Sequence, residues 1–308
     1  MDLSNLKTEI FSEINDIPRV ATAEKASNGS DLIHKVNGLV DVVQSLVFGD
    51  DVWHDRSFYL DTAVNEDSGS GITIESPANT VARIIEIISS KPVMGSISII
   101  ISGTVENAFD FASVRFIGIP KIFLRNNANS NNDCRFVTED DFNAKLIKNY
   151  PYGCQLKIEN LQIDCRNTLN FENINLLTLR NCNFTTSFSH TEVFASISNV
   201  NFLSAINIGF TSSTPNSGTT PILNMRNVNF GKLEYLNFNT EGSRAIGINQ
   251  SQIYIAGNNT FSHRSDENTI GKARESIVNF INQSDETRNN LESEASRYFS
   301  YTVRVQLF

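Results

Sequence analysis

The segment LTLRNCNF, residues 177–184, recurs in related form four more times between residues 156 and 253. The other copies are LKIENLQI (156–163), ASISNVNF (195–202), LNMRNVNF (223–230) and IGINQSQI (246–253). Successive copies begin 21, 18, 28 and 23 residues apart. Recurrence of one segment at a spacing of about 20–50 residues is typical of stacked repeat architectures. This repeat therefore decides the fold that we predict.

Each copy contains a break in its alternation of apolar and polar residues. Leu156 and Ile158 alternate with polar neighbours, as in a strand. Leu161 and Ile163 also alternate, but an odd spacing from Ile158 would place them on the opposite face of a flat strand. Both pairs face one interior only if the chain turns at Asn160, a residue type that tolerates the left-handed conformation of a corner. We predict a right-handed parallel β-helix, with a β-sandwich as the alternative.

Stacking of the five copies predicts three apolar columns and one amide ladder. The first column is Leu156, Leu177, Ala195, Leu223 and Ile246, and the second is Ile158, Leu179, Ile197, Met225 and Ile248. The third, after the corner, is Ile163, Phe184, Phe202, Phe230 and Ile253. The corner residues are amides, which hydrogen-bond along a stack: Asn160, Asn181, Asn199, Asn227 and Gln250.

The composition of the 308-residue chain excludes several classes of protein. A formal net charge of −9 does not suit a nucleic-acid-binding domain, which carries a basic patch. Apolar runs fall short of the roughly 18 residues that cross a membrane. The first residues, MDLSNLKTEI, do not resemble a secretory signal. We therefore expect synthesis in a cytosol, with no nucleic acid and no membrane insertion.

Cysteine and histidine spacing does not predict a metal site or a cofactor. The four cysteines lack C-x-x-C spacing, which favours reduced core thiols over disulfides or metal ligands: Cys134, Cys154, Cys165 and Cys182. The four histidines are scattered without the spacing of metal ligands.

Residues 1–50 are predicted to form a helical segment for attachment and trimerisation. Its apolar residues follow the 4, 3, 4, 3 spacing of a coiled-coil seam: Leu32, Val36, Leu39, Val43 and Leu46. An amphipathic helix packed on its own domain is the alternative, and self-association is favoured because apolar residues are scarce nearby. The short seam alone does not decide between a dimer and a trimer.

The remainder divides into three predicted regions. Residues 51–94 hold a neck strand and a helix at 80–90, which we expect to cap the exposed end of the stack. Residues 95–262 form the shaft, with first rungs at 95–104 and 113–124 and irregular excursions at 125–155 and 211–221. Residues 263–308 form a trimerising or receptor-contacting tip. Its helix is predicted from Ile270, Ala273, Ile277, Phe280 and Ile281, and its strand from the alternation in 298–308.

A turn motif and the cap together resemble a known group of proteins. The motif residues are Tyr59, Asp61, Thr62, Asn65, Asp67, Ser68, Ser70 and Gly71, followed by Ser76, Pro77, Thr80 and the apolar face Val81–Ile88. They resemble bacteriophage tail-fibre and tailspike proteins with a pectate-lyase-like β-helix. Residues 21–41 are also similar to attachment segments of cyanobacterial phage fibres. The resemblance implies a homotrimer that recognises host surface glycans, and some members of the group also cleave them.

Carboxylates are too sparse in the repeats to predict catalysis. Glycoside hydrolysis needs two carboxylates across the scissile bond, whereas only Glu159 falls within a repeated segment, and we assign Arg180, Ser198, Arg226 and Asn249 to its stacked positions. The remaining candidates for a depolymerase are Asp164 and the acidic residues of the excursion, Asp133, Glu139, Asp140 and Asp141. We therefore assign no catalytic residue.

Aromatic residues are the candidates for receptor binding, because sugars stack on aromatic rings. They are Tyr235, Tyr254, Tyr298 and Tyr301, whereas Trp53 is expected to pack at the neck. We expect a homotrimeric structural fibre or spike of a phage virion, attached to other tail or baseplate proteins through residues 1–50, that adheres to a host glycan. The alternatives are a tailspike depolymerase, and a bacterial adhesin or contractile-injection fibre.

Overall fold

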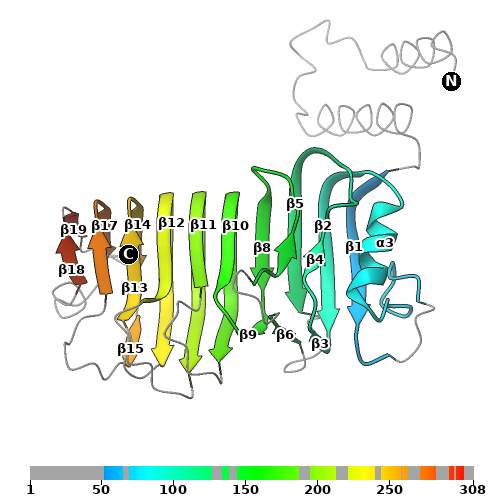
Figure 1. The fold of residues 1–308 in the computed structure, drawn as a ribbon, viewed down its shortest axis with the longest axis horizontal. Coiled ribbons are helices and arrows are strands. Elements are labelled where there is room, and N and C mark those ends of the chain that lie inside the picture. The colour runs from blue at the N-terminus through cyan, green and yellow to red at the C-terminus, as the bar shows by residue number, and fades with distance from the viewer. Residues whose placement is uncertain are drawn as a thin grey trace, which may run out of the picture. The chain divides into compact units, whose positions relative to one another are not determined.

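A computed structural model describes most of the chain after residue 51 (Figure 1). The described residues are 52–64, 69–126, 134–138, 144–186, 195–212, 221–239, 244–257, 259–262, 271–281, 291–294 and 296–301. The chain divides into two compact units, Met1–Trp53 and His54–Phe308, and the second is described below. The predicted helical segment at 1–50, with Leu32, Val36, Leu39, Val43 and Leu46, lies outside the described residues. No helix among the described residues is long and apolar enough to cross a membrane.

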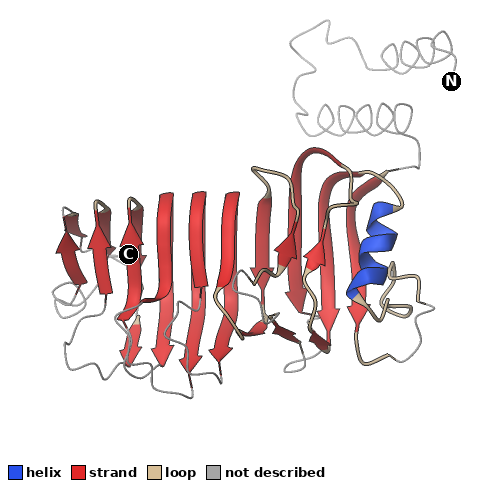
Figure 2. Ribbon diagram, viewed as in Figure 1, coloured by secondary structure: helices blue, strands red, loops and turns tan. Residues whose placement is uncertain are grey.

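The described residues are mainly β-structure, with one helix (Figure 2). The helix is α3 (Val81–Ser89). The first strands are β1 (Trp53–Asp61), β2 (Val93–Ser102), β3 (Thr104–Val105), β4 (Phe109–Asp110), β5 (Phe116–Asn126), β6 (Arg135–Val137), β7 (Ile147–Lys148), β8 (Gln155–Glu159) and β9 (Gln162–Asp164). Next come β10 (Leu169–Thr186), β11 (Ala195–Ser212), β12 (Pro221–Asn239), β13 (Arg244–Asn249), β14 (Gln252–Ala256) and β15 (Thr260–Ser262). The last are β16 (Gly271–Arg274), β17 (Ile277–Ile281), β18 (Leu291–Glu294) and β19 (Arg297–Tyr301).

Parallel pairing joins these strands into one 17-stranded sheet, with β4 and β7 in a second, two-stranded sheet. Each turn of the chain places up to three strand segments beside those of the neighbouring turn, and Figure 1 shows successive strands lying side by side. The long strand β12 pairs with β13 through its first part, with β14 through its middle and with β15 through its last part. We call these the first, second and third strand positions, and the paired strands β2–β19 the stack. The arrangement is compatible with a parallel β-helix.

The repeated segment occupies two different corners of a turn. Copies 156–163 and 177–184 pair with each other, Leu156 opposite Leu177 and Ile163 opposite Phe184. Copies 195–202, 223–230 and 246–253 pair around the preceding corner, where Ala195 lies opposite Leu223. The single predicted ladder is therefore wrong, because the strand register separates its members.

The corner residues form two amide ladders instead of one. In the first, the side chains of Asn173, Asn199 and Asn227 are joined by hydrogen bonds of 3.3 and 3.0 Å, and Gln250 donates to Glu275 at 3.0 Å. In the second, Asn181 donates to Asn160 at 2.9 Å, and Asn207 donates to Asn181 at 3.0 Å. All of these residues have φ between 48° and 59°, the left-handed conformation that the sequence predicted for Asn.

The residues of the first two predicted columns are all buried, at most 2% exposed, but they do not form single columns. Leu177 lies opposite Leu203 and Ala195 opposite Leu169, so the register divides each predicted column between two strand positions. The third column is correct at Ile163, Phe184 and Ile253, which are fully buried, and wrong at Phe202 and Phe230, which are 52% and 39% exposed. After Asn199, Val200 faces inward, Asn201 and Phe202 face outward, and Leu203 faces inward again. This second phase shift, which Asn181 lacks, turns both phenylalanines to the outer face.

A different aromatic column fills the interior at the third strand position. Phe184, Phe210 and Phe238 lie in register on β10, β11 and β12. Their ring centroids are 5.1 and 4.8 Å apart, with interplanar angles of 16° and 8°. Stacked rings at this separation add to the free energy of burial. Phe210, which the sequence analysis placed in no column, is the middle ring.

The predicted cap helix is confirmed as α3, at the β1 end of the stack (Figure 1). The Thr80 hydroxyl accepts a hydrogen bond from the Arg83 amide at 3.2 Å, which satisfies one of the free donors at the helix N-terminus. Ile84 and Ile88 are fully buried. Gly71 in the turn motif has φ of 64°, and a Cβ there would lie 2.8 Å from the Ile87 side chain. The turn therefore packs directly against the helix.

The predicted C-terminal helix is wrong. Ala273 lies in β16, and Ile277, Phe280 and Ile281 lie in β17, which pair in parallel with β13 and β14. Their spacing fits a helix in isolation, but the exposed edge of the preceding turn offers backbone hydrogen bonds that a strand can satisfy. The predicted terminal strand is present as β19, which pairs with β17, and residues 302–308 lie outside the described part. Within 125–155, β6 belongs to the stack, so this segment is not wholly an excursion.

Candidate functional site

The outer face at the second strand position carries a series of apolar side chains that are exposed or half-buried. Leu176, Phe202 and Phe230 lie in register on β10, β11 and β12. On the following turns, the apolar residues alternate between this row and the neighbouring outward row. Tyr254 lies opposite Lys232, Ile277 lies opposite Gln252, and Phe299 lies opposite Asn279. We call Leu176, Phe202, Phe230, Tyr254, Ile277 and Phe299 the apolar stripe. It follows the direction in which the turns succeed one another, because each turn contributes one member.

Ring contacts connect the central members of the apolar stripe. The Phe202 and Phe230 ring centroids are 6.5 Å apart, and those of Phe230 and Tyr254 are 4.8 Å apart. Ile277 is 39% exposed and Phe299 43%. Contiguous apolar surface of this kind marks interaction sites on soluble proteins. The apolar stripe is therefore the strongest candidate for a binding surface on the described part of the chain.

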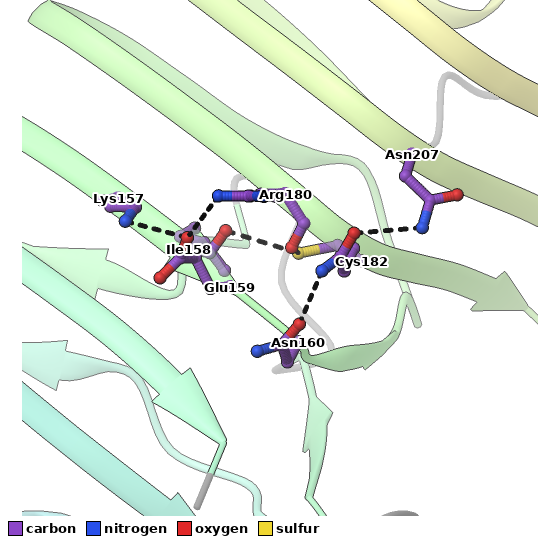
Figure 3. A network of polar contacts seen from close by, with 8 residues as sticks. Lys157, Ile158, Glu159, Asn160, Arg180, Cys182 and Asn207 are labelled. Atoms are coloured by element: carbon purple, nitrogen blue, oxygen red, sulfur yellow. Dashed lines mark hydrogen bonds and ion pairs between the residues drawn. The ribbon is translucent and has the colours of Figure 1, made fainter. Parts of the chain in front are cut away.

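Charged residues of both signs flank the apolar stripe. Glu159 binds the Lys157 ammonium at 2.8 Å and lies 4.0 Å from the Arg180 guanidinium (Figure 3). Three turns beyond Glu159, Lys232 and Glu234 form an ion pair of 2.9 Å. Figure 3 also shows that this charged group adjoins the corner with Asn160 and Asn207. The flank combines hydrogen-bonding groups with locally balanced charge.

Four described carboxylates of the stack form ion pairs with cations. Asp164, a predicted depolymerase candidate, is buried and pairs with Arg135. Glu172 pairs with Lys145, as Glu159 and Glu234 pair with lysines. Arg180 lies opposite Glu159 as predicted, but Ser198, Arg226 and Asn249 lie at the first strand position. The excursion candidates Asp133, Glu139, Asp140 and Asp141 lie outside the described residues.

All four cysteines are free and buried. Burial raises the pKa of Cys134 and of Cys154 to about 12, and that of Cys182 to about 11. Burial also raises the pKa of Cys165. Thiols with such pKa values are protonated at neutral pH and are poor nucleophiles. They act as small apolar residues of the core, which is the favoured sequence interpretation.

Two open clefts also mark the surface. One, of about 620 Å³, lies between α3 and residues 107–113 and has a largely apolar lining that includes Val81, Ile85 and Ala108. Asp110 lines it, and hydrogen bonds from the Asn149 amide and the Ala112 backbone lower the pKa of its carboxyl. The other, of about 240 Å³, lies at the first strand position. Its polar lining is Asn224, Arg244, Asn249, Lys272 and Arg274.

The structure does not bring the predicted receptor-binding tyrosines together as one group. Tyr254 belongs to the apolar stripe. Tyr235 is 53% exposed and occupies a corner, with φ of 55°, where the neighbouring turns have Asn207 and Gly257. Tyr298 packs edge-on against the buried Phe280 ring at 5.9 Å and donates to the Leu291 carbonyl at 3.3 Å. The backbone of Tyr301 ends β19.

Sequence reasoning missed Phe202 and Phe230 as surface residues, because their segments match copies in which this position is buried. The signal that could have found them is the apolar pair Phe202-Leu203, which cannot both face inward on one strand. No protein-family model, curated protein or solved structure matches this chain. The function must therefore be argued from the geometry above.

Proposed function

We propose that this protein is a structural fibre or spike of a phage virion, built around a right-handed parallel β-helix, that adheres to a host-cell surface glycan. In this proposal it is a homotrimer, and residues 1–50 attach it to other tail or baseplate proteins. Three identical copies would strengthen weak individual contacts through multivalency.

The observation that carries this proposal is the in-register stack with amide ladders at two corners. Each ladder ties three successive turns to one another outside the core, which suits a stiff shaft that transmits force between two ends. Ion pairing of four carboxylates of the stack adds support for adhesion over cleavage. A glycosidase needs one carboxyl free to donate a proton and another free to attack or activate water.

Glycan binding is tested with the full chain on immobilised bacterial lipopolysaccharides and capsular polysaccharides. We expect binding without release of reducing ends, and loss of binding in Tyr235→Ala, because Tyr235 is an exposed ring held on a rigid corner. Tyr152→Ala is the matched control, since Tyr152 is 87% exposed at a different position. Release of reducing ends would support the depolymerase instead, and an absence of binding across such a panel would count against adhesion.

The virion assignment has its own test. Antibodies raised against the purified chain should label phage tails in electron micrographs of particles that encode it. Labelling of bacterial surfaces in the absence of phage would favour the bacterial adhesin or injection-system fibre.

A further inference from the structure

We infer that the apolar stripe is the surface through which copies of this chain pack against one another, with their stack axes side by side. The inference rests on the proposed function, because it assigns the interface of the proposed homotrimer. It concerns the outer face of the second strand position, on which the sequence analysis singled out only Tyr254, as a receptor-binding candidate.

The chemistry of the stripe favours a protein partner over a sugar. Five of its six members, all except Tyr254, are Leu, Ile or Phe, which have no polar group to bind a hydroxyl. Sites for polar ligands combine apolar contact with precisely placed hydrogen-bonding groups. Burial against an equally apolar surface removes the stripe from water without leaving unsatisfied hydroxyls.

The arrangement of the stripe fits identical copies around a common axis. One apolar residue per turn, drawn from two adjacent outward rows, produces a band along the stack. Neighbouring copies with parallel axes can therefore bring their bands together over its length. The ion pairs of Lys157 with Glu159 and of Lys232 with Glu234 keep the flanks close to neutral. Approach of an identical flank therefore avoids strong like-charge repulsion.

The size of this face matches a stable interface. Nine strands contribute to it: β2, β5, β8, β10, β11, β12, β14, β17 and β19. At about 4.8 Å between strands, they span about 38 Å, and five residues with their side chains make the face about 20 Å wide. The product is about 760 Å², close to the roughly 800 Å² that each partner buries in a standard interface. The apolar stripe occupies the six strands from β10 to β19 of this face, and Lys121 and Gln155 continue it with polar residues on β5 and β8.

Cross-linking of the full chain tests the location of the interface. Ser204 and Ser198 both face outward on β11 and are similarly half-buried, but Ser204 lies beside the stripe and Ser198 at the first strand position. We expect a short bis-maleimide linker to join copies of Ser204→Cys and not copies of Ser198→Cys. The native cysteines are buried and stay silent. Persistent oligomers without cross-linking through position 204 would overturn the inference.

Sedimentation of stripe variants tests the energetics. Phe202→Ser and Phe230→Ser should each raise the dissociation constant of the oligomer at least tenfold, as truncation of a central aromatic residue does at interfaces. Ile119→Ser is the control, since Ile119 is 60% exposed outside the stripe. Unchanged dissociation in both phenylalanine variants, or a wild-type chain that stays monomeric at all concentrations, would overturn the inference.

The outcomes separate this inference from the proposed function. Stripe-dependent oligomers that bind no polysaccharide would support the interface and count against adhesion. A monomer that binds a neutral oligosaccharide in a Phe202-dependent manner would overturn the interface and identify the stripe as a glycan site.

Discussion

Replacement of Asn199 by alanine would separate the two contributions of a corner residue to stability. The Asn199 amide donates to Asn173 at 3.3 Å and accepts from Asn227 at 3.0 Å, and its φ is 54°. Alanine removes both hydrogen bonds but retains the Cβ that disfavours this left-handed conformation. Two exposed hydrogen bonds contribute about 1–2 kcal/mol, and the conformation costs about 1 kcal/mol more for alanine. The expected loss is therefore about 2–3 kcal/mol.

Asn201 provides a matched control two residues away on the same strand. It donates to Asn175 at 2.9 Å and accepts from Asn229 at 2.8 Å, without a positive φ. Asn201→Ala should therefore cost only the hydrogen bonds, about 1–2 kcal/mol. Asn199→Gly should fall close to this value, because glycine loses the same amide but adopts the left-handed conformation freely.

Urea unfolding followed by far-ultraviolet circular dichroism would measure these differences, provided that the slope of the transition is the same in all variants. The expected order of stability loss is Asn199→Ala first, with Asn199→Gly and Asn201→Ala similar to each other. Equal losses in Asn199→Ala and Asn201→Ala would refute the argument from backbone conformation. Negligible losses in all three would refute the role of the ladders.

Three further perturbations probe the core, the thiols and the first turn. Phe210→Ala should lower the free energy of unfolding by about 3–5 kcal/mol, because it leaves a cavity in the middle of a stacked column. Phe210→Leu should lower it by less. Equal losses in the two variants would argue against ring stacking. Ellman's reagent at pH 8 should leave all four thiols unmodified until denaturant is added, since they are buried and Cys182 has a pKa of about 11. Rapid labelling of the native protein would contradict the burial of the thiols in the core. Hydrogen bonds from the Ser96 hydroxyl (2.6 Å) and amide (2.8 Å) lower the pKa of Asp55. The contribution of Asp55 to folding stability is therefore present above its unfolded-state pKa of about 3.9. This contribution is lost as the pH falls through the lower folded-state pKa. Asp55→Ala should therefore reduce the free energy of unfolding by less than about 1 kcal/mol at pH 7, because the carboxylate is largely exposed. The difference in stability from wild type should disappear in acid. A difference that persists below the folded-state pKa would contradict this role of the carboxylate.

Local pattern was sufficient where a residue's environment depends on its immediate neighbours. The spacing of Val81, Ile84 and Ile88 predicted the cap helix, and Asn at 160, 181 and 199 predicted left-handed corners. The same local pattern failed at Ile277 and Phe280, which read as a helix but form β17. Helical spacing over a few residues is weak evidence when an unpaired strand edge lies beside the segment, and this edge is invisible in the sequence.

The chemistry of each side chain, the presence of corners and the apolar character of the core could be derived from the order of residues. Which corner stacks on which could not, because the same eight-residue segment fits two positions of a turn, and only the pairing of whole turns chooses between them. That pairing separates Asn181 from Asn199 and turns Phe202 and Phe230 outward while Phe184 stays inside. The buried column and the exposed stripe thus arise from nearly identical segments, distinguished by a shift in phase that only the neighbouring strands impose.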